Sequence, residues 1–400
     1  MVDRERGRSG WGADGRGDSW RGMVKNMRSK GTLITGRALG KRVNRETAIP
    51  KIRASRSSAL VLLGMGIYIA YLRRLGLGEV AESLEGLSLA ALSAALALAL
   101  LMVGFNALSW RRMVEELDLS ASFGDLFMIY LSSIFANNLI PTGSFSGETA
   151  RTYFLARIGG GGRYDAALAS VAASRIITAV PFILGMVLGI GYITRLHAVP
   201  GWALTACFGM MVFSVSAGFA FVGICFEERW MQRTAAAAVG PLERIFRREL
   251  DRGVCSGAVT GFMRSMILLR ERRGAILEAL AWAIAGWISL VMVALAAFAS
   301  LGVEVSPLAI LAVYSVVIVF QTLPLGLPGG IGLVEILMTA LFSAIGVPIH
   351  DAAAVTILIR LVQLWFLALL GGLSAFHLIR RIERGGEEPA PPAGSRGAGI

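Results

Sequence analysis

The stretch LPLGLPGGIGLVE, Leu323 to Glu335, decides the fold of this chain. It separates two apolar runs, 307–322 and 336–345, and it contains two prolines and four glycines. Proline has no backbone N–H and glycine is a poor helix former, so a helix through these runs must break here. At membrane depth a break is tolerated only where it is buried in protein or lines a cavity. The stretch therefore predicts a functional site or a hinge inside a membrane.

A second stretch, NNLIPTGSFSGETAR from Asn137 to Arg151, repeats this design after another apolar run. Seven residues separate Pro141 from Glu148, and the same step separates Pro328 from Glu335. Two breaks with one spacing suggest that a single unit occurs twice in the chain.

The helices expected after the two breaks extend the parallel. Each opens with an Asp-Ala-Ala sequence; Arg175 follows Asp165 by ten residues, and Arg360 follows Asp351 by nine. We interpret the pattern as two copies of one unit, a broken-helix hairpin with the helix that follows it. The units cover about 124–193 and about 306–379.

Composition sets the class of protein. Of the 400 residues, 55% are hydrophobic and 16% are charged, and the mean hydropathy is +0.65. Several apolar runs are long enough to cross a hydrocarbon core of about 30 Å. The sequence therefore predicts an all-α polytopic membrane protein with about six full spans and two broken-helix hairpins. The spans are expected at about 58–76, 87–109, 166–193, 201–226, 275–300 and 350–379.

The basic residues indicate orientation in the membrane. The formal net charge is +12, but Lys and Arg gather beside the spans, as cytoplasmic loops do, so no nucleic-acid partner is expected. If both hairpins return to the face they enter, the ten Lys and Arg of 227–274 lie inside. Both termini are then cytoplasmic, in a multi-pass protein of the inner or plasma membrane. The hairpins enter from opposite faces, as in inverted-repeat transporters.

The two ends of the chain differ from its apolar middle. Residues 1–57 are rich in Arg, Gly and Ser, and we expect a disordered basic cytoplasmic tail there. The transmembrane domain is predicted at 58–380, followed by a second disordered cytoplasmic tail at 381–400. The three cysteines and three histidines have no metal-ligand or redox spacing. We therefore expect neither a metal nor another cofactor.

The two breaks carry a resemblance to a known family. Their motifs are Asn138, Pro141 and Gly147-Glu148-x-x-Arg151 in the first unit, and Pro328-Gly329-Gly330-x-Gly332-x-x-Glu335 with Arg360 in the second. Over about 58–380 the chain resembles the membrane domain of lysylphosphatidylglycerol synthases. That family includes free-standing flippase-like proteins linked to polar-lipid, hopanoid and archaeal glycolipid pathways. Members that transfer aminoacyl groups carry a large soluble synthase domain, so the resemblance implies the lipid-moving half without the lipid-modifying half.

Polar side chains at membrane depth are costly, so they are the candidates for function. The candidate substrate-binding residues are Asn137, Asn138, Glu148, Arg151, Arg175, Glu335 and Arg360. The candidate hairpin-tip residues are Pro141, Gly147, Pro328, Gly329, Gly330 and Gly332. No residue is singled out as catalytic, because no nucleophile motif, nucleotide motif or metal cluster is present.

Two interpretations of these polar residues stay open. In the functional interpretation, Arg175 and Arg360 pair with Glu148 and Glu335 or hold a lipid phosphate, for which a guanidinium offers two parallel donors. In the structural interpretation, each arginine braces its own hairpin through a buried salt bridge or a backbone carbonyl. The two interpretations are compatible. Arg360 follows the more specific motif and is the preferred phosphate ligand. The asparagines before the first break either bind substrate or satisfy backbone carbonyls that Pro141 leaves free.

Two classes of function remain. In the first, the protein moves a polar lipid or a lipid-linked intermediate between leaflets, and the hairpin tips near the midplane handle the head group. In the second, it is a membrane-embedded lipid-modifying transferase, or an accessory subunit of one, with Glu148 or Glu335 as a base. The first is favoured because no catalytic motif is present, so we expect no enzyme. The expected partners are lipids with anionic or polar head groups; a lipid-modifying enzyme and self-association stay open.

Overall fold

The structure is a computed structural model that describes residues 54–385, except 141–144, 160, 196–199, 228, 235, 238–251 and 323–326. The described residues belong to one compact unit of the chain. Every regular element among them is a helix. Pro141 and most of both predicted tails, 1–53 and 386–400, lie outside the described residues.

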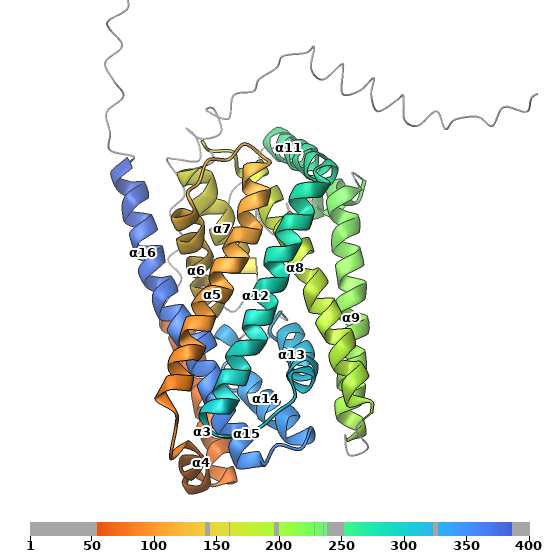
Figure 1. Ribbon diagram of the computed structural model, residues 1–400. Helices are drawn as coiled ribbons and strands as arrows, with labels where there is room; N and C mark the ends of the chain where they lie inside the picture. The colour runs from red at the N-terminus through yellow and green to blue at the C-terminus, as the bar shows by residue number, and fades with distance from the viewer. Residues whose placement is uncertain are drawn as a thin grey trace, which may run out of the picture. The chain divides into compact units, whose positions relative to one another are not determined.

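The helices follow one another in the order that the apolar runs predict (Figure 1). Before the first break come α3 (Ala54–Leu75), α4 (Leu77–Leu84), α5 (Leu89–Glu115) and α6 (Phe123–Leu139). Between the breaks come α7 (Phe145–Ile158), α8 (Tyr164–Ile193), α9 (Gly201–Phe226), α11 (Arg252–Glu271), α12 (Arg273–Ser300) and α13 (Pro307–Thr322). After the second break come η1 (Pro328–Gly330), α14 (Leu333–Ala344), α15 (Ile349–Arg360), η2 (Leu361–Phe366) and α16 (Leu367–Gly385).

Five helical segments among the described residues are long and apolar enough to cross a membrane. They are α5, α8, α9, α12 and the continuous run from α15 to α16. A sixth is present if α3 and α4, which meet at an angle of 91°, count as one span. The prediction of an all-α polytopic membrane protein is confirmed. Helix α3 begins at Ala54 and α16 ends at Gly385, so a few residues assigned to the predicted tails are helical.

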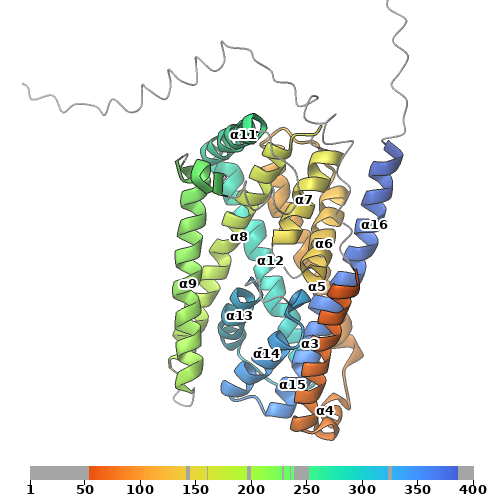
Figure 2. The same ribbon diagram turned by 180° about the vertical axis from the view of Figure 1, so that it is seen from behind.

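The two predicted units pack against each other reciprocally. Helix α5 lies along α12, the closing helix α8 of the first unit packs on α13, and the closing helix α16 of the second unit packs on α6. Figures 1 and 2 show the hairpin of α6 and α7 in one half of the bundle and α13 and α14 in the other half. Each unit therefore completes the surroundings of the other unit's hairpin.

Small residues allow the two central helices to approach closely. In α5 four of the buried residues, Ala95, Ala99, Val103 and Ala107, lie one turn apart. In α12 the buried positions include Ala279, Ala283 and Gly286. Close contact of small residues is a common way for helices to associate in a membrane. The α5–α12 pair forms the centre of the bundle, and the first hairpin packs on it through α6.

The second break depends on glycine. Gly329, Gly330 and Gly332 have φ of +60°, +64° and +91°, in the left-handed region that other residues rarely adopt. Gly332 also lies so close to α3 that a Cβ on it would collide with the carbonyl oxygen of Gly64. The turn therefore requires glycine for its conformation and, at Gly332, for its contact with α3.

Two helices were not foreseen from the sequence. Helix α4 turns sharply away from α3 and packs on α15 with Val80 buried. Helix α11 lies in the basic segment 227–274 and packs on α8 and α9. The lengths of the apolar runs did not indicate a helix in this segment. Both helices are partly polar, so a search for membrane spans passes over them.

Candidate functional site

The two breaks meet inside the bundle. Helix α6, which ends at the first break, packs against η1, which forms the second. A Cβ built on Gly329 would lie 3.3 Å from Oδ1 of Asn138 and 3.7 Å from its backbone oxygen. Asn138 and Gly329, almost two hundred positions apart in the sequence, thus form one junction between the two breaks.

At the second break a buried ion pair closes the hairpin. Nε of Arg360 lies 2.6 Å from Oε1 of Glu335, and their side chains are 9% and 5% exposed. Nη2 of Arg360 donates to the backbone oxygen of Gly329 over 2.7 Å, and Oε2 of Glu335 accepts from the backbone N–H of Gly332 over 2.6 Å. One arginine and one carboxylate therefore connect α15, the tip and the first turn of α14.

Buried hydroxyl groups surround this pair. Thr339 lies one turn after Glu335 and Thr356 lies one turn before Arg360; both are fully buried. Among the described residues, neither these two hydroxyls nor that of Tyr68 has a hydrogen-bond partner of good geometry. The second break is therefore neutral in charge and tightly packed, and it is lined with buried hydroxyl groups that can still form hydrogen bonds.

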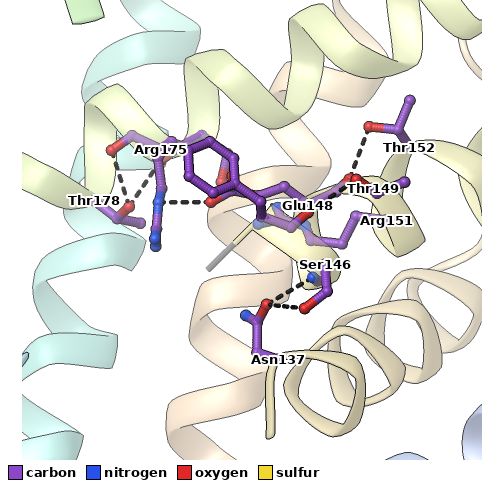
Figure 3. A network of polar contacts seen from close by, with 11 residues as sticks. Asn137, Ser146, Glu148, Thr149, Arg151, Thr152, Arg175 and Thr178 are labelled. Carbon is purple, nitrogen blue, oxygen red and sulfur yellow. Dashed lines mark hydrogen bonds and ion pairs between the residues drawn. The ribbon is translucent and has the colours of Figure 1, made fainter. Parts of the chain in front are cut away.

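At the first break Asn137 has a structural task. Its Oδ1 accepts from the backbone N–H of Gly147 over 2.6 Å and from Oγ of Ser146 over 3.1 Å (Figure 3). A Cβ on Gly147 would lie 2.5 Å from Nδ2 of Asn137 and 2.6 Å from the backbone oxygen of Ser133. Asn137 thus caps the start of α7 and holds it against α6, where Gly147 leaves the room for close contact.

The first break has its own ion pair, and this pair is more open. Nε of Arg175 on α8 lies 2.8 Å from Oε1 of Glu148 on α7, and the side chains are 45% and 25% exposed. Figure 3 shows Arg175 extending from α8 to Glu148 on the neighbouring helix. Both acid–arginine pairs that the sequence suggested are thus present, one accessible and one enclosed.

Arg151 gives the first break a second guanidinium, and this one is buried. Its Cζ lies 4.1 Å from the ring centre of Trp110 and 4.8 Å from that of Tyr130. Nη2 donates to Oγ of Ser174 over 3.2 Å, and Nε has no hydrogen-bond partner among the described residues. The first break therefore holds two guanidinium groups beside one carboxylate, Glu148.

The pairs occupy equivalent places in the two units. Each glutamate lies in the first turn of the helix after its break. Arg175 lies eleven residues after Tyr164, where α8 begins, and Arg360 lies eleven residues after Ile349, where α15 begins. What distinguishes the units is Arg151, for which the second unit has no cationic counterpart: the residue three positions after Glu335 is Met338.

The sequence reasoning missed the aromatic surroundings of Arg151. Trp110 lies at the end of α5 and Tyr130 in the middle of α6, so neither belongs to a motif near a break. Only the packing of α5, α6 and α7 brings these rings to the guanidinium. In the sequence, Trp110 stands out because it directly precedes Arg111 and Arg112. This pattern is equally typical of an anchor at the membrane surface, so it does not identify Trp110 as a partner of Arg151.

A family model described as the lysylphosphatidylglycerol synthase TM region matches residues 57–371. The chain belongs to this family. The matched range contains both breaks and both acid–arginine pairs. The resemblance that the two motifs suggested is confirmed.

Three relatives of the chain are archaeal membrane proteins. The chain is 25% identical to a UPF0104 membrane protein of Methanothermobacter thermautotrophicus, over 79% of its own length and 94% of the relative's. It is 26% identical to the UPF0104 membrane protein PH1989 of Pyrococcus horikoshii, over 67% and 81% of the two lengths. It is 23% identical to the UPF0104 membrane protein MJ1595 of Methanocaldococcus jannaschii, over 84% and 98%.

Proposed function

We propose that this protein translocates a polar lipid, or a lipid-linked intermediate, between the leaflets of the cell membrane. The observation that carries the proposal is the junction of the two breaks, where Asn138 meets Gly329 and each hairpin brings an acid–arginine pair. Charged groups at membrane depth normally line a path for substrate or ions. A junction between two opposed broken helices is also where secondary transporters bind their substrates.

The hairpins are short for full spans, which supports entry and return on the same face. Helix α7 has 14 residues and α14 has 12, or about 21 Å and 18 Å at 1.5 Å per residue. Both are shorter than a hydrocarbon core of about 30 Å. With the ten Lys and Arg of 227–274 inside, the first hairpin opens to the cytoplasm and the second to the outside.

The charges of the two breaks support a division of labour. The first break has two arginines, Arg151 and Arg175, and one glutamate, Glu148. Its net positive charge favours binding of an anion. The pair of Arg360 and Glu335 is balanced and enclosed. We therefore assign contact with a head-group phosphate to the first break, and the bracing of the hairpin to the second.

A leaflet-exchange assay tests the proposal. Purified protein is reconstituted into phosphatidylcholine vesicles with traces of NBD-phosphatidylglycerol, and dithionite reports how much label reaches the outer leaflet. The parent is expected to make the inner-leaflet label accessible. Glu148→Gln combined with Arg175→Gln should slow this, whereas Arg195→Gln, just beyond the end of α8, should not. Exchange at the parental rate in the double variant would remove the first break from the path.

The same preparation separates this function from the alternative of a lipid-modifying transferase. Lipid extracts of the vesicles are analysed by mass spectrometry before and after exchange. Translocation leaves the labelled lipid chemically unchanged. A new lipid mass that depends on Glu148 or Glu335, without any exchange between leaflets, would favour the transferase.

A further inference from the structure

Helix α11 lies across the end of the bundle near the start of α8, away from the end that carries α4 (Figures 1 and 2). Its inner face is apolar and packs into the core cluster that also holds α7. The buried residues of this face are Phe262, Met263, Met266 and Leu269. Gly261 lies so close to Asp165 of α8 that a Cβ would collide with the carboxylate. The helix is therefore fixed to the base of the first unit.

The outer face of α11 combines cations with large apolar side chains. Ile267 and Leu268 are 44% and 37% exposed, and Arg264 and Arg270 on the same helix are exposed as well. Exposing Ile267 and Leu268 to bulk water is unfavourable, and so is exposing Arg264 and Arg270 to hydrocarbon. A helix that presents both kinds of side chain fits the boundary between them, where arginines extend to the head groups and apolar groups enter the acyl region.

The arginines of this face lack acidic partners within the part of the chain that the structure describes. Neither Arg264 nor Arg270 forms an ion pair there, although other arginines at this end of the bundle do. Arg112 is paired with Glu278 over 2.9 Å and Arg272 with Glu116 over 3.3 Å. Glu271, which follows Arg270 at the end of α11, is exposed and forms no ion pair with either arginine among the described residues. The outer face of α11 keeps its cations available for an anion outside the chain.

We propose that the outer face of α11 is a docking surface for anionic phospholipid head groups of the adjacent leaflet. Cationic residues beside a membrane attract anionic lipids, and the apolar residues hold the helix at the depth of the head groups. This surface is separate from the breaks and stands whether or not the protein translocates lipid. Because α11 packs on α8, the helix that follows the first hairpin, this surface gathers anionic lipids near that hairpin.

Spin-labelled lipids test the surface directly. The full chain is reconstituted in phosphatidylcholine vesicles with a trace of spin-labelled phosphatidylglycerol or spin-labelled phosphatidylcholine. Electron paramagnetic resonance gives the fraction of each label that the protein immobilises. We expect the parent to prefer phosphatidylglycerol at low salt and to lose that preference as salt is added. Arg264→Gln with Arg270→Gln should weaken the preference, by up to about fivefold for each charge removed.

Two further variants make the result specific. Arg73→Gln with Arg74→Gln removes the same charge from the last turn of α3, at the end of the bundle that carries α4, and should keep the preference. Arg264→Lys with Arg270→Lys keeps the charge of α11 and should also keep it. The proposal is overturned if the glutamine variant of α11 selects phosphatidylglycerol as strongly as the parent. It is equally overturned if the α3 variant loses as much selectivity as the α11 variant.

Discussion

Arg360 binds Glu335 and the backbone of Gly329 at the same time, through Nε over 2.6 Å and through Nη2 over 2.7 Å. Because the ion pair is enclosed, removing either charge would leave the other buried without a partner. Arg175 and Glu148 form the equivalent contact in the first unit with much more exposure. Two contacts of the same kind therefore have different physical consequences: one supports the fold, and the other is open to a ligand.

Removing one member of the enclosed pair should destabilise the protein strongly. Arg360→Gln leaves the Glu335 carboxylate buried without its cation, at a cost of about 3–5 kcal/mol. Glu335→Gln with Arg360→Gln leaves no unpaired charge and should recover much of that loss. Thermal unfolding in detergent, followed by a fluorescent dye that does not react with thiols, measures the stability of both variants. A double variant as unstable as the single one would show that the geometry of the pair matters more than its charge.

The open pair should behave in the opposite way. Arg175→Gln is expected to change the free energy of unfolding by no more than about 1 kcal/mol, as for exposed ion pairs. Leaflet exchange of NBD-phosphatidylglycerol should nevertheless fall. Arg175→Lys should also exchange lipid more slowly, because an ammonium cannot offer two parallel donors. If Arg175→Lys exchanges lipid at the parental rate, Arg175 supplies charge alone.

Arg151 is a buried cation with an unused donor, and such groups usually lower stability. Arg151→Met keeps much of the volume between Trp110 and Tyr130 but removes the charge. The loss of the cation–aromatic contacts, about 2 kcal/mol when buried, is smaller than the desolvation cost of several kcal/mol that disappears. We therefore expect equal or higher thermal stability together with slower lipid exchange. Lower stability with unchanged exchange would make Arg151 a structural residue.

The cap of α7 should be sensitive to a single methyl group. Gly147→Ala places a Cβ 2.5 Å from Nδ2 of Asn137 and 2.6 Å from the backbone oxygen of Ser133. We expect a loss of about 1–3 kcal/mol, as for other overpacked sites. Gly191→Ala in α8 is the matched control, because nothing lies within 4 Å of its Cβ. Thermal unfolding compares the two, and equal stability would mean that the hairpin can shift without cost.

The orientation of the hairpins can be tested with an impermeant thiol reagent on whole cells. Single cysteines at Glu85, Glu304 and Pro348 should be labelled from outside, and one at Arg163 should not. These positions are exposed in the structure and lie between helices or at their ends. Labelling of all four from outside would rule out opposed hairpins.

The background for that experiment is a chain whose three cysteines are replaced. Cys207 and Cys225 are buried, and their replacement by alanine or serine is checked by expression level. Gly240 lies outside the described residues, in the basic segment 227–274, and offers a second inside position. External labelling there would contradict the placement of this segment in the cytoplasm.

Local sequence was sufficient for the membrane spans, the breaks and the partners of Arg175 and Arg360, but not for α4 and α11. The spans follow from apolar length, the second break follows from its glycines, and the equal spacing of the units pairs Glu148 with Arg175 and Glu335 with Arg360. The preference for Arg360 as a phosphate ligand rested on its motif. Motifs do not reveal exposure, and exposure now favours Arg175 for that role.

Features that depend on packing could not be derived from the sequence. Trp110 and Tyr130 reach Arg151 from two other helices, so no local spacing connects the three. Helix α4 bends by 91° from α3 at Gly76, whose φ is +97°, but its packing on α15, more than 250 residues away in sequence, is not visible locally. The described side chains of α11 include one buried apolar stripe, and exposed arginines interrupt it in the sequence, so a search for continuous hydrophobicity does not detect it.

The wide π-helical turn η2, Leu361–Phe366, directly follows Arg360 and separates two faces of one span. Before the turn, the helix is oriented by the contact of Arg360 with Glu335; after it, Gly371 must face the backbone oxygen of Leu131 on α6. A π turn holds one residue more than an α turn. Deleting one residue within the turn would restore a regular helix and leave Gly371 facing α6, whereas deleting one from the regular helix between the turn and Gly371 would rotate Gly371 by about 100° away from α6. Within this span, the π turn is therefore the place where the chain can lose one residue while both contacts, that of Arg360 and that of Gly371, are kept.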